Sequence, residues 1–241
     1  MPLPIVRTYI SIFKTPKKNS LEFQYQHFAK NKASLTILQI GANDGLINDP
    51  LADLIFKFNV HAILIEPQPA VFHQFLQPLH QKNKNIQLIN AAIALQNGTQ
   101  ALYTISFSNK RWATGLASFE KQSLEKSISS GYVERAAKKF NDPLPKDPTT
   151  WIKTIDIQTL NFKTLFNNYH LQHIDVFQID VEGYDLEILK MFPFELIKPS
   201  LIGFETDHIS ADDLLNTRRK LEQLGYELEI FSRDALARLK E

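Results

Sequence analysis

The chain has 241 residues, which is long enough for one α/β domain that buries roughly 70–75% of the surface of its unfolded form. It contains 27 Lys and Arg and 26 Asp and Glu, so its formal net charge of +1 gives no electrostatic reason to expect a nucleic-acid partner. Because cysteine is absent, disulfides, thiolate metal sites and a cysteine nucleophile are excluded.

Residues 1–33 are predicted to form an N-terminal arm or helix before the main domain of residues 34–241. The start, MPLPIVRTYISIFK, is apolar but has no basic region before it and no small-residue cleavage site after it, so we expect a docking segment rather than a secretory signal. The basic run of Lys14, Lys17 and Lys18 is typical of a solvated arm. No apolar run reaches the roughly 20 residues of a membrane helix, and we expect a cytoplasmic protein.

Strand and helix patterns alternate in the first part of the main domain. The apolar, branched run before Gly41 predicts a buried parallel strand, and Asp49 followed by Pro50 fits the start of a helix. His73 and His80 fall on the second helix, where we expect them at the surface. The expected order is strand 34–41, helix 50–58, strand 60–65, helix 69–80 and strand 86–94. This alternation predicts an α/β fold with a doubly wound, mostly parallel, Rossmann-like sheet.

The later pattern is interrupted by residues 108–150, which are rich in Ser and Lys, contain a helical stretch near 123–140 and end in a proline-rich run. An irregular segment of this length within a compact domain predicts an inserted lid or substrate-binding segment, and a surface excursion without function is the alternative. The flanking elements are expected as strands 100–107 and 151–157, helix 162–169, strand 174–181, helix 184–191, strand 201–205, helix 211–224 and strand 226–231.

Polar or acidic residues follow nearly every expected strand. In a doubly wound sheet, ligands bind outside the carboxyl ends of the strands, so these residues predict a single site. They are Gly41-Ala42-Asn43-Asp44-Gly45, Glu66-Pro67, Asn90-Ala91-Ala92, Asp180-Val181-Glu182-Gly183 and Glu205-Thr206-Asp207-His208.

The loop LQIGANDGLIND lacks the G-x-G-x-x-G spacing that presents helix amides to a diphosphate. Asp44 within it is a poor neighbour for a diphosphate and a good one for a cationic amine or sulfonium. Glu66 follows Gly45 by 21 positions (66 − 45), where an acidic side chain can accept both ribose hydroxyls. Together these residues favour a positively charged nucleoside, and S-adenosylmethionine is the obvious candidate.

Asp180 and Glu182, in FQIDVEGYDLEIL, would share one face if the strand remains extended. Two such carboxylates suit an amine site, a general base or a divalent-cation site, although a helix N-terminus also favours acids for structural reasons. We take Asp180 as the first catalytic candidate and Glu182 as the second. We expect no metal, because exposed acids such as Glu205 and Asp207 and a single histidine, His208, are usually only solvated.

The series QIGANDG, IEPQP, NAAIA, FQIDVEGYDLEIL and LIGFET resembles the FkbM family of S-adenosylmethionine-dependent methyltransferases over residues 36–206. The resemblance implies a class I methyltransferase fold, commonly acting on a hydroxyl oxygen of a sugar, polysaccharide or other natural product. It implies that Gly41, Asn43 and Gly45 line the methionine part of the cofactor, that Glu66 holds the ribose hydroxyls, and that Asn90 and Ala91 lie beside the adenine. It also implies that Asp180 faces the transferred methyl group or the acceptor.

Three residues depart from the family pattern: Gln39 and Asn161 replace acids, and Gln178 replaces a lysine. Within the insertion, Arg111 and Trp112 offer a cation and an aromatic platform for an acceptor, and Gly115 and Ser118 offer flexibility and hydrogen bonding. Trp112 could equally anchor the insertion to the core.

Two other functions remain open on the sequence alone. An acid at the end of the second strand also binds the ribose of NAD, so an NAD-dependent oxidoreductase is one alternative. The departures from the family pattern are compatible with a second alternative, an inactive cofactor-binding protein. We expect a small-molecule or glycan acceptor as partner. The oligomeric state is not fixed by the sequence, which allows a homo-oligomer.

Overall fold

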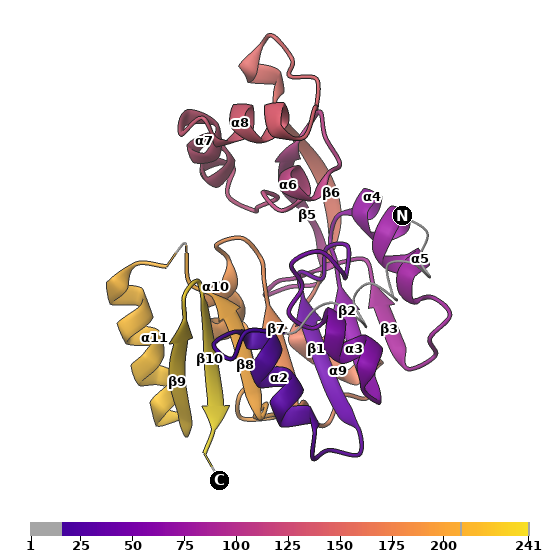
Figure 1. The fold of residues 1–241 in the computed structure, drawn as a ribbon, viewed down its shortest axis with the longest axis vertical. Helices are drawn as coiled ribbons and strands as arrows, with labels where there is room; N and C mark the ends of the chain where they lie inside the picture. Colours follow the sequence, from indigo (N-terminus) through magenta and orange to yellow (C-terminus); the bar gives the residue numbers. More distant parts are fainter. Residues whose placement is uncertain (1–15, 208, 241) are drawn as a thin grey trace.

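The computed structural model describes residues 16–207 and 209–240 (Figure 1). The expected docking segment, Lys14 and His208 lie outside the described residues. Within the described ranges, no helix is both long and apolar enough to cross a membrane.

A seven-stranded sheet in the order β3-β2-β1-β7-β8-β10-β9 forms the centre of the molecule. Neighbouring strands from β3 to β8 are parallel, whereas β10 runs antiparallel to both β8 and β9. Strand order reverses between β1 and β7, which places a ligand crevice at their carboxyl ends. The strands are β1 Leu35–Ile40, β2 Val60–Ile65, β3 Ile86–Ile89, β7 Val176–Ile179, β8 Leu201–Glu205, β9 Tyr226–Phe231 and β10 Asp234–Leu239.

Helices cover both faces of this sheet because successive side chains of a strand point to opposite faces. Ile37 of β1 packs with α2, α3 and η1, whereas Leu38 packs on the other face with α9, α10 and α11. The doubly wound α/β fold is therefore confirmed. The helices are α2 Leu21–Ala29, α3 Ala52–Lys57, α4 Pro69–Val71, η1 Phe72–Leu76, α5 Gln77–His80, α9 Phe162–Asn168, α10 Asp185–Met191 and α11 Ala211–Gln223.

A second, three-stranded sheet carries the insertion. It has the order β4-β6-β5, with β4 Ala92–Ile93, β5 Gly98–Ile105 and β6 Ile152–Leu160. Residues 106–151 between β5 and β6, here called the cap, stand over the carboxyl ends of the main-sheet strands (Figure 1). Trp112, Leu124, Val133 and Trp151 pack together as the apolar core of the cap. Its helices are α6 Arg111–Thr114, α7 Lys121–Ser129, α8 Tyr132–Lys139 and η2 Pro148–Thr150.

Several expected elements differ in the structure. The strand expected over 86–94 is broken at Asn90, since β3 stays in the main sheet and β4 joins β6. The helix expected over 123–140 is divided into α7 and α8 by Gly131, whose φ is 71°. Strand β10 was not expected at all, because DALARL has no clear strand period and only its pairing with β8 and β9 defines it.

Two side chains on the first helices also differ from expectation. Helix α3 begins at Ala52 rather than Pro50, and Asp49 Oδ1 accepts from the Leu51 amide at 2.8 Å in the turn before it. His80 is not at the surface as predicted: it is 1% exposed and stacks on Phe56 with ring centroids 5.5 Å apart. His73 is exposed, as expected.

Helix α2 is joined to the sheet by a buried hydrogen bond. The Tyr25 hydroxyl donates to Gln178 Oε1 at 2.5 Å, and Gln178 Nε2 donates to the Ile179 carbonyl at 2.9 Å. Gly203 on the next strand leaves room for the Tyr25 hydroxyl, because a Cβ there would overlap with it. This contact gives Gln178, which departs from the family pattern, a structural role.

Candidate functional site

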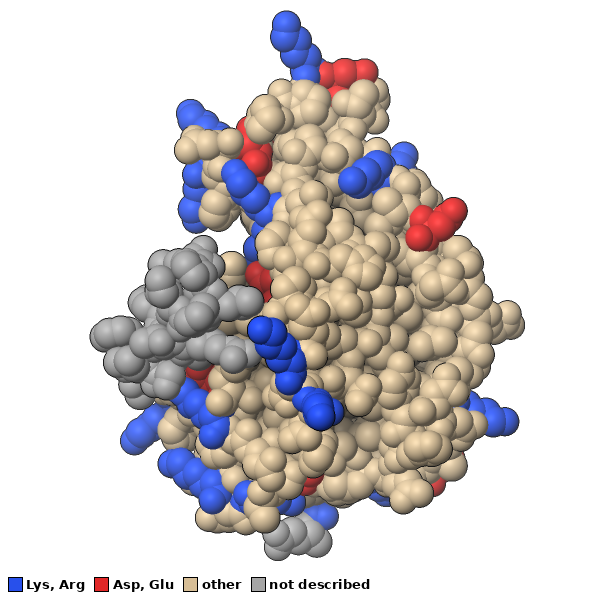
Figure 2. Space-filling view, turned by 90° about the vertical axis from the view of Figure 1, so that its right-hand side faces the viewer, with Lys and Arg blue, Asp and Glu red and all other residues tan. Residues whose placement is uncertain are grey.

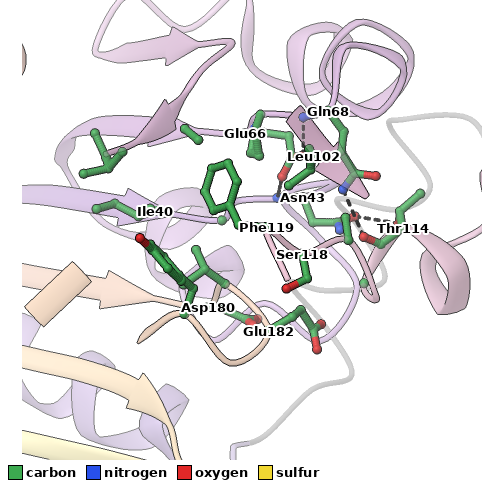
Figure 3. Close-up of a pocket in the computed structure, with 18 of the residues that line it drawn as sticks. Ile40, Asn43, Glu66, Gln68, Leu102, Thr114, Ser118, Phe119, Asp180 and Glu182 are labelled. Atoms are coloured by element: carbon green, nitrogen blue, oxygen red, sulfur yellow. Dashed lines mark hydrogen bonds between the residues drawn. The ribbon is translucent and has the colours of Figure 1, made fainter. Parts of the chain in front are cut away.

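A cavity lies where the carboxyl ends of the main-sheet strands meet the cap (Figure 3). Its volume is about 60 Å³. Among the residues predicted from the strand ends, those that line it are Gly41, Asn43, Glu66, Pro67, Ala91, Ala92, Asp180, Val181 and Glu182. Four of the five predicted segments therefore meet in one place, whereas none of the described residues of the fifth, at positions 205–207, lines the cavity.

The first loop turns sharply where β1 lies closest to β7. Gly41 has a φ of 83°, and a Cβ at this position would overlap with the Asp180 carbonyl oxygen. The Gly41 and Ala42 amides both donate to the Ile65 carbonyl, at 3.0 and 2.9 Å, which ties the loop to the end of β2. Asn43 also has a positive φ, of 46°, a conformation that asparagine tolerates better than most residues.

Glu66 is buried at the end of β2 and is held by two backbone amides. Its Oε2 accepts from the Asn43 amide at 2.9 Å and its Oε1 from the Gln68 amide at 2.8 Å. Burial raises the pKa of Glu66 to about 7, although these hydrogen bonds oppose the shift. Each carboxylate oxygen has a second lone pair, so Glu66 can accept further hydrogen bonds from a ligand in the cavity.

Asp180 and Glu182 flank the guanidinium group of Arg111. Arg111 Nη2 lies 3.9 Å from Asp180 Oδ2, and Nη1 lies 3.9 Å from Glu182 Oε1. Strand β7 ends at Ile179 and Glu182 has a φ of 50°, so the two acids do not share a face of an extended strand, which was the geometric premise of their prediction. They come together in the turn instead. Burial, followed by the charge of Asp180, raises the pKa of Glu182 to about 8.

Asp185, in the first turn of α10, does not line the cavity but supports the strand ends beside it, a role that sequence reasoning missed. Its Oδ1 accepts from the Glu205 amide at 3.2 Å and its Oδ2 from the Val181 amide at 3.4 Å, which ties the end of β7 to that of β8. Burial, followed by the charge of Asp180, raises the pKa of Asp185 to about 7. The acid at the start of a helix was visible in the sequence, but its burial was not.

The methyltransferase FkbM domain matches residues 39–228, which span most of the chain. The chain belongs to the FkbM methyltransferase family. It is similar in fold to methyltransferase FkbM from Methylobacillus flagellatus (12% identity, TM-score 0.49, covering 98% of this chain and 58% of that one). Another similar structure is precorrin-6y C5,15-methyltransferase from Geobacter metallireducens (13% identity, TM-score 0.43, 95% of each chain). No curated protein matches the chain in sequence.

Several residues that were predicted to bind the cofactor do not line the cavity, and some of them support the loops. Asp44 Oδ1 accepts from the Leu46 and Ile47 amides at 2.9 and 2.8 Å, which gives it a role in the turn, and its contact with a cationic ligand stays a prediction. Asn90 Nδ2 donates to the Glu66 carbonyl at 2.8 Å. Neither these two residues nor Ala42 and Gly45 are among the described residues that line the cavity.

Gly45 is required by packing. A Cβ at this position would lie 2.8 Å from Leu76 Cδ1 and 3.1 Å from His80 Nε2, and the φ of Gly45 is 69°. The second glycine of the loop therefore lets the chain lie against helices η1 and α5.

Of the two residues proposed for acceptor binding, Arg111 lines the cavity and Trp112 does not. Trp112 is 7% exposed, and its Nε1 donates to Asp142 Oδ2 at 2.6 Å. Trp112 packs in the apolar core of the cap itself and does not anchor the cap to the core of the main domain, which was the alternative expectation.

The cap contributes Gly115 and Ser118, as expected from the sequence, and also residues that no sequence motif indicated, including Thr114 and Phe119. Gln68 Nε2 donates to the Thr114 carbonyl at 2.9 Å, and Thr114 Oγ1 donates to Asn43 Oδ1 at 3.3 Å. These buried contacts, here called the Gln68–Thr114–Asn43 seam, join the cap to both loops that end β1 and β2 (Figure 3). Only contacts between distant parts of the chain could reveal them.

Arg233 forms ion pairs with the two acids at and just after the end of β8. Arg233 Nη2 lies 2.7 Å from Glu205 Oε1, and its Nε lies 2.5 Å from Asp207 Oδ2. Within the described part of the chain, no group of three or more His, Asp or Glu residues is arranged to hold a metal ion.

Charged residues are scattered over the face drawn in Figure 2. Lys and Arg lie mainly around its rim and on the cap, and uncharged residues cover its centre. The described residues of this face form no continuous basic surface that could follow a phosphate backbone. That the protein has no nucleic-acid partner stays a prediction.

Proposed function

We propose that this methyltransferase uses S-adenosylmethionine to methylate a hydroxyl oxygen of a sugar, polysaccharide or other natural product. The observation that carries the proposal is the Glu66 carboxylate, which is fixed by two amides and lines the cavity. An acid at the end of the second strand is suited to accept both hydroxyls of a ribose.

The residues of the cavity fit the parts of this cofactor. Asp180 offers negative charge to the amine and the sulfonium, and Gly41 allows a ligand to approach the backbone closely. Pro67, Ile93 and other apolar residues suit the base. The volume of about 60 Å³ is well below the ~300–1,000 Å³ of ligand pockets, so side chains of the cavity have to move when the cofactor enters.

The cofactor supplies a methyl group that is already activated on sulfonium, so the chain mainly has to align the acceptor with it. Orientation supplies about 7–11 kcal/mol of barrier reduction, compared with roughly 3–5 kcal/mol for a general base. Asp180 is the first candidate to orient the acceptor hydroxyl and take its proton, and Glu182 is the second. Arg111 lies between them and holds both carboxylates near the cavity.

Isothermal titration with S-adenosylmethionine and S-adenosylhomocysteine tests the proposal. We expect the wild type to bind both and Glu66→Gln to bind about 10- to 100-fold more weakly, because hydrogen bonds to a charged group are lost. Glu195→Gln, at an exposed position that does not line the cavity, is the control and should bind normally. Absence of binding to the wild type would refute the cofactor assignment.

Turnover decides between an active enzyme and a cofactor-binding protein. S-adenosylhomocysteine should form when hydroxylated sugars and natural products are supplied, and Asp180→Asn should slow its formation by about 10²–10⁴-fold if Asp180 takes the proton. Cofactor binding without turnover on a broad acceptor panel would favour the inactive alternative. The family match argues against the oxidoreductase alternative, which tight NADH binding would revive.

A further inference from the structure

One wall of the cavity is apolar and follows directly on the proposed ribose site. Pro67, the residue after Glu66, lines this wall together with Ala91, Ile93 and Leu102. A nucleoside whose ribose is bound by Glu66 would direct its base toward these residues. The two faces of a purine are flat and apolar, so the base needs a flat partner as well as an apolar wall.

Phe119 brings an aromatic ring to this wall from the cap. Its half-buried side chain projects into the cavity and packs in the apolar cluster of Ala92 and Leu102 (Figure 3). The ring meets that of Tyr184 edge to face, with centroids 5.3 Å apart and an interplanar angle of 64°. Phe119 is thus the aromatic side chain of the cap that lines the cavity.

Hydrogen bonds hold the backbone next to Phe119, whereas the ring of Phe119 has no polar atom to hold it in place. The Tyr103 amide donates to the Ser118 carbonyl at 2.9 Å, and the Ser118 amide donates to the Tyr103 carbonyl at 3.0 Å, which ties this part of the cap to β5. The Gln68–Thr114–Asn43 seam fixes the cap a few residues earlier. The ring of Phe119 therefore stays at the cavity whichever way it turns.

Because the cavity is small, a side chain that lines it has to move when a ligand enters. The contacts of each side chain indicate which one moves. Glu66 and Asn43 are fixed by hydrogen bonds, whereas the Phe119 ring packs in an apolar cluster and against the Tyr184 ring, and a phenyl ring has no hydrogen bond to lose when it rotates. We propose that Phe119 turns on cofactor binding and supplies the aromatic face on which the purine stacks. This inference rests on the proposed function and makes the cap a part of the cofactor site.

Two ligands that differ only in the base provide the test. S-adenosylhomocysteine and S-ribosylhomocysteine share the ribose and the amino acid, and only the first has a purine. Isothermal titration of Phe119→Ala should show an affinity for S-adenosylhomocysteine that is about 5- to 100-fold lower, as expected for the loss of base stacking, and an unchanged affinity for S-ribosylhomocysteine. Phe119→Leu should be intermediate, and Phe119→Trp should bind both ligands like the wild type.

Controls separate stacking from damage to the cap. Phe140→Ala removes an exposed cap phenylalanine (43% exposed) and should leave both affinities unchanged. Both tryptophans of the chain, Trp112 and Trp151, are buried in the cap, so their fluorescence reports whether a variant keeps the cap folded. If Phe119→Ala changes the spectrum, the comparison of Phe119→Leu with Phe119→Trp provides the test.

The possible results are distinct. An equal loss of affinity for both ligands, no loss for either, or tighter binding of S-adenosylhomocysteine by Phe119→Ala would each overturn the stacking role. Failure of the wild type to bind either ligand would instead refute the proposed function itself.

Discussion

At the scale of single residues, Gly41 shows how local conformation and close packing act together. Its φ of 83° is costly for any residue with a Cβ, and that Cβ would also overlap with the Asp180 carbonyl oxygen. The glycine that the sequence identified as a loop residue is therefore also the point at which β1 and β7 approach each other.

Gly41→Ala is expected to destabilise the fold by about 2–5 kcal/mol, because a left-handed conformation and an overlap are both imposed. Gly225→Ala is a matched control: the φ of Gly225 is 97°, but its Cβ would only contact Leu239 Cδ1 at 3.7 Å. It should cost about 1–2 kcal/mol, the conformational part alone. Urea unfolding measures both, and equal costs would contradict a role for the contact with Asp180.

Residue type alone did not distinguish ligand-binding acids from structural ones. Glu66 and Asp180 line the cavity as predicted, whereas Asp44, which is as polar and lies in the glycine loop itself, accepts hydrogen bonds from the next turn. Asp185 was overlooked and is buried between two strand ends. The direction of each carboxylate depends on which amides lie nearby, and those amides belong to different strands.

At the scale of elements, the cap is joined to the sheet by few polar contacts, of which the Gln68–Thr114–Asn43 seam is buried. The sequence predicted an insertion over 108–150 from its composition, and the structure places the cap at residues 106–151. It could not show that α6 lies against the ends of β1 and β2, since those residues are more than forty positions away in the chain. The function of the cap as a lid stays a proposal.

Gln68→Ala should loosen the cap, because the buried Thr114 carbonyl loses its donor at a cost of about 1–3 kcal/mol. We expect faster hydrogen exchange in residues 111–118, measured by mass spectrometry. Gln74→Ala, an exposed change in the same helical segment, should leave exchange unaltered. Unaltered exchange in Gln68→Ala would show that the seam does not hold the cap.

At the scale of the whole molecule, buried carboxyl groups gather at the carboxyl edge of the sheet. Burial is the largest cause that raises the pKa of Glu66 and of Asp185 to about 7 each, compared with ordinary values near 4. Asp175 lies at the opposite end of β7. Burial by itself would raise its pKa, but hydrogen bonds, of which the one from the Thr36 amide has the largest effect, hold the pKa below the usual range.

The stability of the protein should therefore fall as the pH rises. Between pH 4 and 7 the unfolded chain has already released the protons of Glu66 and Asp185 while the folded protein retains them, so ionisation favours unfolding. We expect the free energy of unfolding to be highest near pH 4 and to fall by roughly 2–5 kcal/mol between pH 5 and pH 8. Below pH 4, protonation of Asp175 reverses the trend.

Urea unfolding of the cofactor-free protein at pH 5 to 8 measures this dependence. Asp185→Asn should flatten the decline, because the side chain no longer releases a proton. A stability that rises from pH 5 to 8 in the wild type would contradict the raised pKa values.

The sequence by itself determined the alternation of apolar strands with helices and the polar residues at strand ends, because burial on both faces of a sheet and tight turns impose local residue types. The tertiary structure decided the rest. Strand β10 exists through its pairing with β8 and β9. Trp112 packs in the apolar core of the cap. Phe119 lines the cavity because β5 and β6 carry the cap to the ends of the main strands. These outcomes depend on contacts between residues far apart in the chain, which no local pattern encodes.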